Sequence, residues 1–186
     1  MPLATHRPDA PIITIDSVSK IVWSGFRVGW IRASADVIGR VRFVKALDDL
    51  GTATISQWLT LQIMDRLDTL IAQRCEHLAD RAAHAHQLVT TVLPEWSVPR
   101  PMGGASLWAE LPGQVAPAFV RHAARCGVLL IGDDAFAVAE PTGRHIRLPF
   151  TAPVADFVAA IERLATAWDT FDLRSYDRPR PRIALV

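Results

Sequence analysis

A stretch with neither glycine nor proline, 52–93, occupies the middle of the sequence and limits the folds open to it. In its second part, apolar residues recur at intervals of four and three, the pattern of a helix with one buried stripe. This predicts a helix over 69–93 that starts near Asp68 and is about 37 Å long. Such a helix could join two domains, although a core helix or one arm of an antiparallel hairpin would show the same stripe. The stripe consists of Ile71, Cys75, Leu78, Ala82, Ala85, Val89 and Val92.

Two strand-like segments and one helix are expected before this long helix. The β-branched run 12–15 predicts a short buried strand, and the alternation of apolar residues across 26–30 predicts a second strand. A helix is expected over 34–47, with Ser34 at its N-terminal cap.

The segment after the long helix has the pattern of a compact α/β domain. Strands are expected at 105–111, 128–131 and 146–150. A helix is expected over 116–126, with Pro117 in its first turn and Gly127 just after its end. A final amphipathic helix is expected over 154–168.

Charge and composition exclude several classes of partner. The 20 Lys and Arg residues nearly balance 19 Asp and Glu residues, so general attraction to nucleic acid or to an acidic membrane is not expected. Half of the residues are hydrophobic, yet no signal peptide or membrane-spanning run is visible. Cys75 and Cys126 cannot build a disulfide framework. We expect a cytoplasmic protein without nucleic-acid or membrane contact, and a disordered Arg- and Pro-rich tail over 174–186.

Hydroxyl and basic side chains cluster directly after the first predicted strand. Ser17 and Ser19 precede Lys20, and Arg27 follows after Gly25. A guanidinium fork with hydroxyl donors suits a phosphate dianion, and each charge-assisted hydrogen bond is worth about 1.5–3 kcal/mol. The lysine could pair with that phosphate or react with an aldehyde. The plain alternative is a solvated lysine with a structural arginine. A Walker loop is excluded, because no glycine pair precedes Lys20 at the required spacing.

Three motifs resemble the class I/II aminotransferases, the fold-type I enzymes of pyridoxal 5'-phosphate. The segment 17–29, Ser-Val-Ser-Lys-x4-Gly-x-Arg-x-Gly, resembles their lysine motif. The segment 103–108, Gly-Gly-Ala-Ser-Leu-Trp, is similar to the glycine-led strand of their C-terminal small domain. The segment 145–150, His-Ile-Arg-Leu-Pro-Phe, is similar to the strand that carries their substrate-carboxylate arginine. The resemblance implies the C-terminal portion of this α/β fold: the end of the large domain, a long linking helix and an α/β small domain.

The resemblance also implies a role for each candidate residue. Lys20 would form the Schiff base with the cofactor aldehyde and then move protons, as the catalytic residue. Ser17 and Arg27 would hold the cofactor phosphate, and Ser19 would assist or serve only the turn. Arg147 would receive the α-carboxylate of an amino acid or 2-oxo acid. Its place on the strand supports this, because it alternates with apolar residues and so faces away from the core. A structural salt bridge is the alternative role for Arg147.

By resemblance, the chain comprises a remnant of the cofactor-binding large domain (1–68), the linking helix with the small domain (69–173) and the tail (174–186). The implied activity is amino-group transfer between an amino acid and a 2-oxo acid, by a protein that is homodimeric in the full-length family. Family members continue for a long stretch before the lysine motif. We therefore expect an N-terminally truncated or wrongly started chain, which could be inactive.

The surroundings of the lysine motif and of 103–108 most resemble the aminotransferase-like domains of MocR/GntR-type bacterial regulators. A second function therefore stays open, namely an effector domain that binds the cofactor without turnover. No metal site is expected. Of Cys75, His77, His84 and His86, only His77 and His84 share a helix face, and two histidines alone make a weak site.

Overall fold

The computed structural model describes residues 3–7 and 9–173, so the tail for which disorder is predicted lies outside the described residues. The chain divides into two compact units, Met1–Glu76 and His77–Val186. Helix α5 (Leu67–Val92) begins in the first unit and ends in the second, which confirms the long helix predicted over 69–93. Within the described ranges, no helix combines the length and the apolar composition needed to cross a bilayer.

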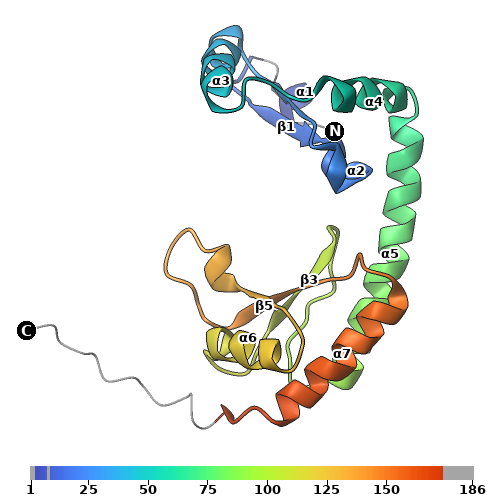
Figure 1. Ribbon diagram of the computed structural model, residues 1–186, viewed down its shortest axis with the longest axis vertical. Coiled ribbons are helices and arrows are strands. Elements are labelled where there is room, and N and C mark those ends of the chain that lie inside the picture. The colour runs from blue at the N-terminus through green and yellow to red at the C-terminus, as the bar shows by residue number, and fades with distance from the viewer. Residues whose placement is uncertain (1–2, 8, 174–186) are drawn as a thin grey trace, which may run out of the picture. The chain divides into compact units, whose positions relative to one another are not determined.

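The first unit contains two short strands that pair antiparallel (Figure 1). Strands β1 (Thr14–Ser17) and β2 (Gly29–Arg32) align with Ser17 opposite Gly29. A helical turn, α2 (Val18–Ile21), and a 3-10 turn, η1 (Ser24–Phe26), form the connection between them. The remaining elements of this unit are helices α1 (Leu3–His6), α3 (Ala35–Asp48) and α4 (Thr54–Met64).

Two expectations for the first unit are wrong in detail. The first strand is not buried, because Ile13 and Ile15 are 53% and 72% exposed. The second strand begins only at Gly29, because 24–26 form the 3-10 turn and Arg27 adopts the left-handed conformation with φ of 52°. A left-handed residue cannot continue an extended strand, so the apolar alternation across 26–30 gave a start that is too early.

Helix α3 confirms the helix predicted over 34–47, with Ser34 in extended conformation at its N-cap. Asp36 in its first turn and Lys45 in its last turn oppose the helix dipole favourably. Several of its apolar residues are nevertheless exposed, as are several of those of α4; Phe43 and Trp58 are examples. Burial of apolar surface therefore stabilises the first unit much less than the second.

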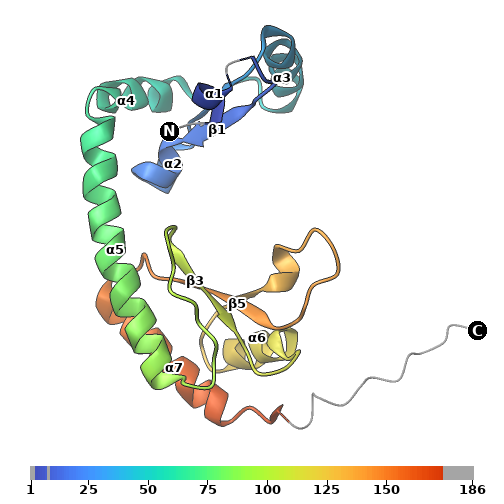
Figure 2. The ribbon, with the colours of Figure 1, turned by 180° about the vertical axis from the view of Figure 1, so that it is seen from behind.

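The second unit is a three-stranded antiparallel sheet packed against helices (Figure 2). Its strands lie in the order β3 (Ser106–Glu110), β5 (His145–Pro149) and β4 (Ile131–Gly132). The strand predicted at 128–131 is wrong in its bounds, because only its last residue belongs to β4 and Leu129 is 89% exposed. The other elements are helix α6 (Ala116–Arg125), the 3-10 turn η2 (Asp133–Ala135) and helix α7 (Val154–Asp169).

One face of this sheet forms the core with α6, α7 and the C-terminal half of α5. Leu107, Ile146 and Leu148 project from β3 and β5 into the core and are almost completely buried. An aromatic cluster fills the opposite side of the core, where Phe119 meets Trp168 edge-to-face with ring centroids 5.0 Å apart. The strict alternation of the two strands therefore leaves their other side chains on the face away from the core.

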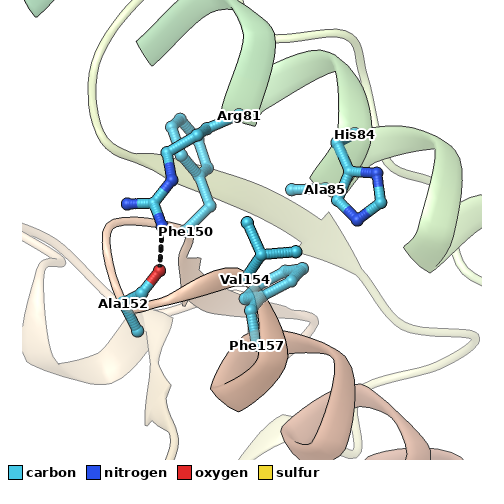
Figure 3. A pocket seen from close by; sticks show the side chains of 7 residues that line it. All are labelled: Arg81, His84, Ala85, Phe150, Ala152, Val154 and Phe157. Carbon is cyan, nitrogen blue, oxygen red and sulfur yellow. Dashed lines mark hydrogen bonds between the residues drawn. The ribbon is translucent and has the colours of Figure 1, made fainter. Parts of the chain in front are cut away.

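Arg81 of α5 fastens the loop between β5 and α7. Its two terminal nitrogens donate hydrogen bonds to the carbonyl oxygens of Thr151 and Ala152, at 2.8 and 2.6 Å. Arg81 and Phe150 are among the residues that line a small cavity (Figure 3). This cavity measures about 10 Å³, which is room for about one water molecule. The contact fixes the end of β5 against α5, so it is a structural clamp and not a ligand site.

The carboxylate of Asp133 holds the loop between η2 and β5 through hydrogen bonds. The residue is 7% exposed, and its Oδ2 accepts a hydrogen bond from the Thr142 hydroxyl at 2.6 Å. Burial by itself raises the pKa of Asp133. The hydrogen bonds from Thr142 and from the backbone N–H groups of Arg144, Gly143 and His145 outweigh burial, so the pKa lies below its ordinary value of 3.8. The ionised carboxylate therefore favours the folded loop.

Replacing Arg81 tests the clamp on the β5–α7 loop. We expect Arg81→Ala to lower the free energy of unfolding by about 1–3 kcal/mol, because two hydrogen bonds from a charged group are lost. Urea unfolding followed by tryptophan fluorescence measures this change. Arg121→Ala is the matched control, since Arg121 is exposed on α6 and has no side-chain partner among the described residues. Equal losses in the two variants would contradict the clamp.

The buried carboxylate predicts how stability depends on pH. A folded-state pKa below the unfolded value means that Asp133 contributes stability above about pH 4, and that this contribution is lost as the pH falls through the folded value. We expect Asp133→Asn to be less stable than the wild type at pH 7 and to lose less stability between about pH 5 and pH 2. Urea unfolding across that range measures the slope. The exposed neighbour supplies the control, because Asp134→Asn should keep the wild-type slope.

Candidate functional site

The turn after β1 is held by the side chain of Ser17. Its hydroxyl accepts a hydrogen bond from the backbone N–H of Ser19 at 3.1 Å and donates one to the carbonyl oxygen of Val28 at 2.9 Å. The first contact caps α2, and the second joins the start of α2 to the residue before β2. Ser17 thereby fixes the segment that carries Lys20 against the segment that carries Arg27.

Glycine at position 29 allows the two strands to approach closely. A Cβ atom on Gly29 would lie 2.9 Å from the carbonyl oxygen of Asp16, which is closer than such atoms come in real proteins. The backbone there cannot yield without breaking the β1–β2 pairing. Gly29 of the lysine motif therefore has a steric role, since the absence of a Cβ atom lets β2 pack closely against the backbone of Asp16.

Lys20 and Arg27 are the two cationic residues of this turn. Lys20 lies on α2 and Arg27 directly follows η1, and α2 and η1 are in contact. Both side chains are exposed, and neither has a hydrogen-bond or ion-pair partner among residues 3–7 and 9–173. Two cations that have no partner among the described residues attract an anion, and their N–H donors are available to it.

The donor set fits a phosphorylated aldehyde such as pyridoxal 5'-phosphate. The Lys20 amine is the type of group that bonds covalently to an aldehyde, and the guanidinium of Arg27 is the type that binds a phosphate. The Ser19 hydroxyl makes no hydrogen bond with any described residue, so it is available to a ligand. The Ser17 hydroxyl already donates its proton to Val28, so it would have to rotate before it could donate to a phosphate.

Arg147 lies in the second unit, on the sheet face away from the core. It occupies the middle of β5, paired with Trp108 of β3 on one side and with Ile131 of β4 on the other. Its Nε donates a hydrogen bond to the hydroxyl of Ser106 at 2.9 Å, and its guanidinium carbon lies 5.8 Å from the centre of the Phe136 ring. Within the described part of the chain, no carboxylate pairs with Arg147. The structural salt bridge that was its alternative role is therefore not found there.

One aromatic ring, that of Phe136, lies against the Arg147 guanidinium, and two further rings pack beside it. Trp108 stacks on the His145 ring, with centroids 5.5 Å apart, and meets Phe136 edge-on at 5.8 Å. His145 in turn lies 3.7 Å from the buried carboxylate of Asp133. Phe136 belongs to the loop that Asp133 holds, and this loop places the Phe136 ring next to Arg147. A guanidinium that has no carboxylate partner among the described residues and lies against the Phe136 ring is suited to a substrate carboxylate, because it offers a charged fork that is partly shielded from water.

The structure groups the candidate residues by unit. Ser17, Ser19, Lys20 and Arg27 share one turn of the first unit, and Arg147 belongs to the second unit. Sequence reasoning missed Ser106 and Phe136, which contact Arg147. Alternation within 105–111 places Ser106 on the outer face, but its contact with Arg147 depends on a strand register that the sequence does not reveal. No group of three potential metal-ligating side chains is found among the described residues.

Comparison with known proteins gives relatives of two kinds. No family model matches the sequence. An aromatic-amino-acid aminotransferase from Thermococcus litoralis is 29% identical over 171 residues, which cover 88% of this chain and 40% of that protein. An uncharacterised HTH-type transcriptional regulator from Bacillus subtilis is 25% identical over 155 residues, which cover 80% of this chain and 31% of the regulator.

The fold leads to the same group of proteins. A crystal structure of kynurenine aminotransferase from Pyrococcus horikoshii superimposes with a TM-score of 0.72 and 25% identity, covering 84% of this chain and 40% of that one. The chain thus spans less than half the length of each of these relatives. The expected resemblance is confirmed: this chain resembles the class I/II aminotransferases in sequence and has the α/β fold of the C-terminal portion of a fold-type I aminotransferase.

Proposed function

We propose that this chain provides the lysine-bearing and carboxylate-binding portion of a pyridoxal-phosphate-dependent aminotransferase. Such an enzyme transfers an amino group between an amino acid and a 2-oxo acid. The observation that carries the proposal is the turn of the first unit, which carries Ser19, Lys20 and Arg27 and in which neither cation has a hydrogen-bond or ion-pair partner among the described residues. The similarity to an aminotransferase over 88% of the chain supports it.

The cofactor assignment rests on the donor set and on one relative. The Pyrococcus horikoshii kynurenine aminotransferase was crystallised in complex with PMP. When bound, pyridoxal 5'-phosphate supplies an aldehyde that bonds to amines and a conjugated ring that withdraws electrons. In this chain Arg27 would bind the phosphate, with Ser19 as a hydroxyl donor and Ser17 holding the turn. The Nζ of Lys20 would hold the aldehyde end and, once displaced by substrate, accept and return a proton.

Arg147 would bind the carboxylate group of the substrate. Its two terminal nitrogens have no partner within the described ranges, so they are available for two parallel hydrogen bonds. Residues 1–68 would then supply the end of the cofactor-binding domain and 69–173 the linking helix and small domain. The resemblance also favours a homodimer in the cytoplasm, without nucleic-acid contact by this chain, and these points stay predictions.

A regulator without turnover is the second candidate function. The similarity to the Bacillus subtilis transcriptional regulator over 80% of the chain favours it. Both functions require the cofactor on Lys20 and a carboxylate on Arg147. They differ in product, because an aminotransferase converts an added amino acid and 2-oxo acid into the exchanged pair, whereas a sensor domain leaves both unchanged. Chromatography of the two acids after incubation with the loaded, complete gene product separates the candidates.

Covalent trapping tests the assignment of Lys20. We expect the full chain to gain a visible absorbance band with pyridoxal 5'-phosphate, and borohydride reduction to fix the added mass on Lys20, as located by mass spectrometry. The sequence contains only one other lysine, Lys45, whose ammonium pairs with Asp49 at 2.6 Å. Lys20→Ala should therefore abolish the adduct, and Lys45→Ala should leave it intact.

The same assay tests Arg27 as the phosphate ligand. Arg27→Ala should weaken binding of pyridoxal 5'-phosphate about 10- to 100-fold, because charge-assisted hydrogen bonds to the phosphate are lost. Attachment of pyridoxal, which lacks the phosphate, should change little. Label found on Lys45 instead of Lys20, or equal weakening with both aldehydes, would contradict the proposed roles.

Substitution of Arg147 tests the carboxylate site. We expect Arg147→Ala to weaken binding of amino acid or 2-oxo acid about 10-fold or more, since the two terminal nitrogens that would bind the carboxylate are removed, while the cofactor still attaches to Lys20. Calorimetric titration with pyruvate measures the binding. Arg144→Ala is the matched control, because Arg144 is already paired with Glu110 at 2.8 Å. Loss of both carboxylate binding and cofactor attachment in Arg147→Ala would mean that Arg147 is structural.

A further inference from the structure

The guanidinium of Arg147 is held at one edge. An arginine side chain can meet a carboxylate side-on, through Nε and one terminal nitrogen, or end-on, through both terminal nitrogens. In this chain the Nε–H is already given to the Ser106 hydroxyl, at 2.9 Å. The side-on arrangement is therefore occupied, and only the end-on fork is left for a ligand.

The Ser106 hydroxyl reaches Arg147 because of the strand register. Arg147 lies opposite Trp108 in the β3–β5 pair, and Ser106 lies two residues before Trp108, opposite Pro149. Side chains related in this diagonal way lie on one face of a sheet, within reach of a long side chain. Ser106 is half-buried, so its hydrogen bond to Nε is partly shielded from water.

A second contact restrains the guanidinium from another segment. The Phe136 ring centre lies 5.8 Å from the guanidinium carbon, a distance at which the ring face attracts a cation. Phe136 directly follows η2, and Trp108 packs edge-on against it at 5.8 Å. The guanidinium is thus held by the hydrogen bond that it donates to Ser106 of β3 and by the Phe136 ring from the loop that Asp133 fixes.

We propose that Ser106 is a positioning residue for substrate binding: by taking the Nε–H of Arg147, it presents the two terminal nitrogens end-on to the substrate carboxylate. Phe136 supports the same orientation. This inference rests on the proposed function, because it assumes that Arg147 receives a carboxylate. Without the Ser106 hydroxyl, Phe136 remains as the described restraint and the Nε–H becomes available to the ligand. Side-on and end-on geometries then compete, so a smaller fraction of the protein holds the guanidinium in the binding orientation.

Removal and rescue of one hydroxyl test the inference on the full chain, with pyruvate as the probe. We expect Ser106→Ala to raise the dissociation constant for pyruvate about 3- to 10-fold, as loss of one hydrogen bond predicts. Ser106→Thr, which keeps the hydroxyl, should restore wild-type binding. Ser97→Ala is the matched control. The backbone of Ser97 pairs with Glu110 of β3, but its hydroxyl has no hydrogen-bond partner among the described residues.

A spectroscopic measurement separates positioning from a general effect on stability. In the ¹⁵N NMR spectrum, the Nε–H signal of Arg147 should shift and exchange faster with water in Ser106→Ala, while Ser97→Ala leaves it in place. The Arg147 Nε–H signal is assigned as the one that is missing from the spectrum of Arg147→Ala. The urea midpoint should be similar in the two serine variants.

The possible results divide clearly. Unchanged pyruvate binding in Ser106→Ala, failure of threonine to rescue, or no binding of pyruvate by the wild type would each overturn the inference. Cofactor attachment to Lys20, measured in the same samples, reports on the proposed function independently. If Ser106→Ala weakens pyruvate binding but Lys20 takes up no cofactor, Ser106 positions a carboxylate site and the aminotransferase assignment fails. If Lys20 is labelled and Ser106→Ala binds pyruvate normally, only the inference about Ser106 fails.

Discussion

The pairing of β3 with β5 is the interaction on which the second unit and its candidate site depend. This register sends Leu107, Ile146 and Leu148 into the core and leaves Ser106 and Arg147 together on the other face. A slip of one residue would exchange the two faces, so that a guanidinium would enter the core and leucines would meet water. Burial of the apolar face thus fixes the position of the polar groups, although they contribute little to stability themselves.

Regular periodicity made much of the fold predictable. The long helix and the strands around Leu107 and Ile146 were expected because their apolar spacing matches one element type, and the described residues confirm them. The burial of 12–15 could not be predicted, because an apolar run shows that a strand forms but not what covers it. The late start of β2 depends on the left-handed Arg27, a conformation that few sequence signals announce.

The two halves of the candidate site also differ in how far the sequence predicts them. Ser17, Lys20 and Arg27 lie close together in sequence, so their grouping in one turn follows from local chain geometry. The contact between Ser106 and Arg147 joins residues from different strands, and only the register brings them within 2.9 Å. Local chemistry can be read from a motif, whereas the orientation of a side chain by a distant hydroxyl needs the folded sheet.

The placement of the indole rings makes the two units optically distinct. Trp96 and Trp168 sit in the edge-to-face cluster of the second unit, with 4% and 8% of their surface exposed. Trp23 and Trp58 in the first unit are 65% and 58% exposed. Indoles in water emit at longer wavelengths than indoles in an apolar core. Loss of structure around Trp96 and Trp168 therefore shifts the emission to longer wavelengths, whereas loss of structure around Trp23 and Trp58 shifts it little.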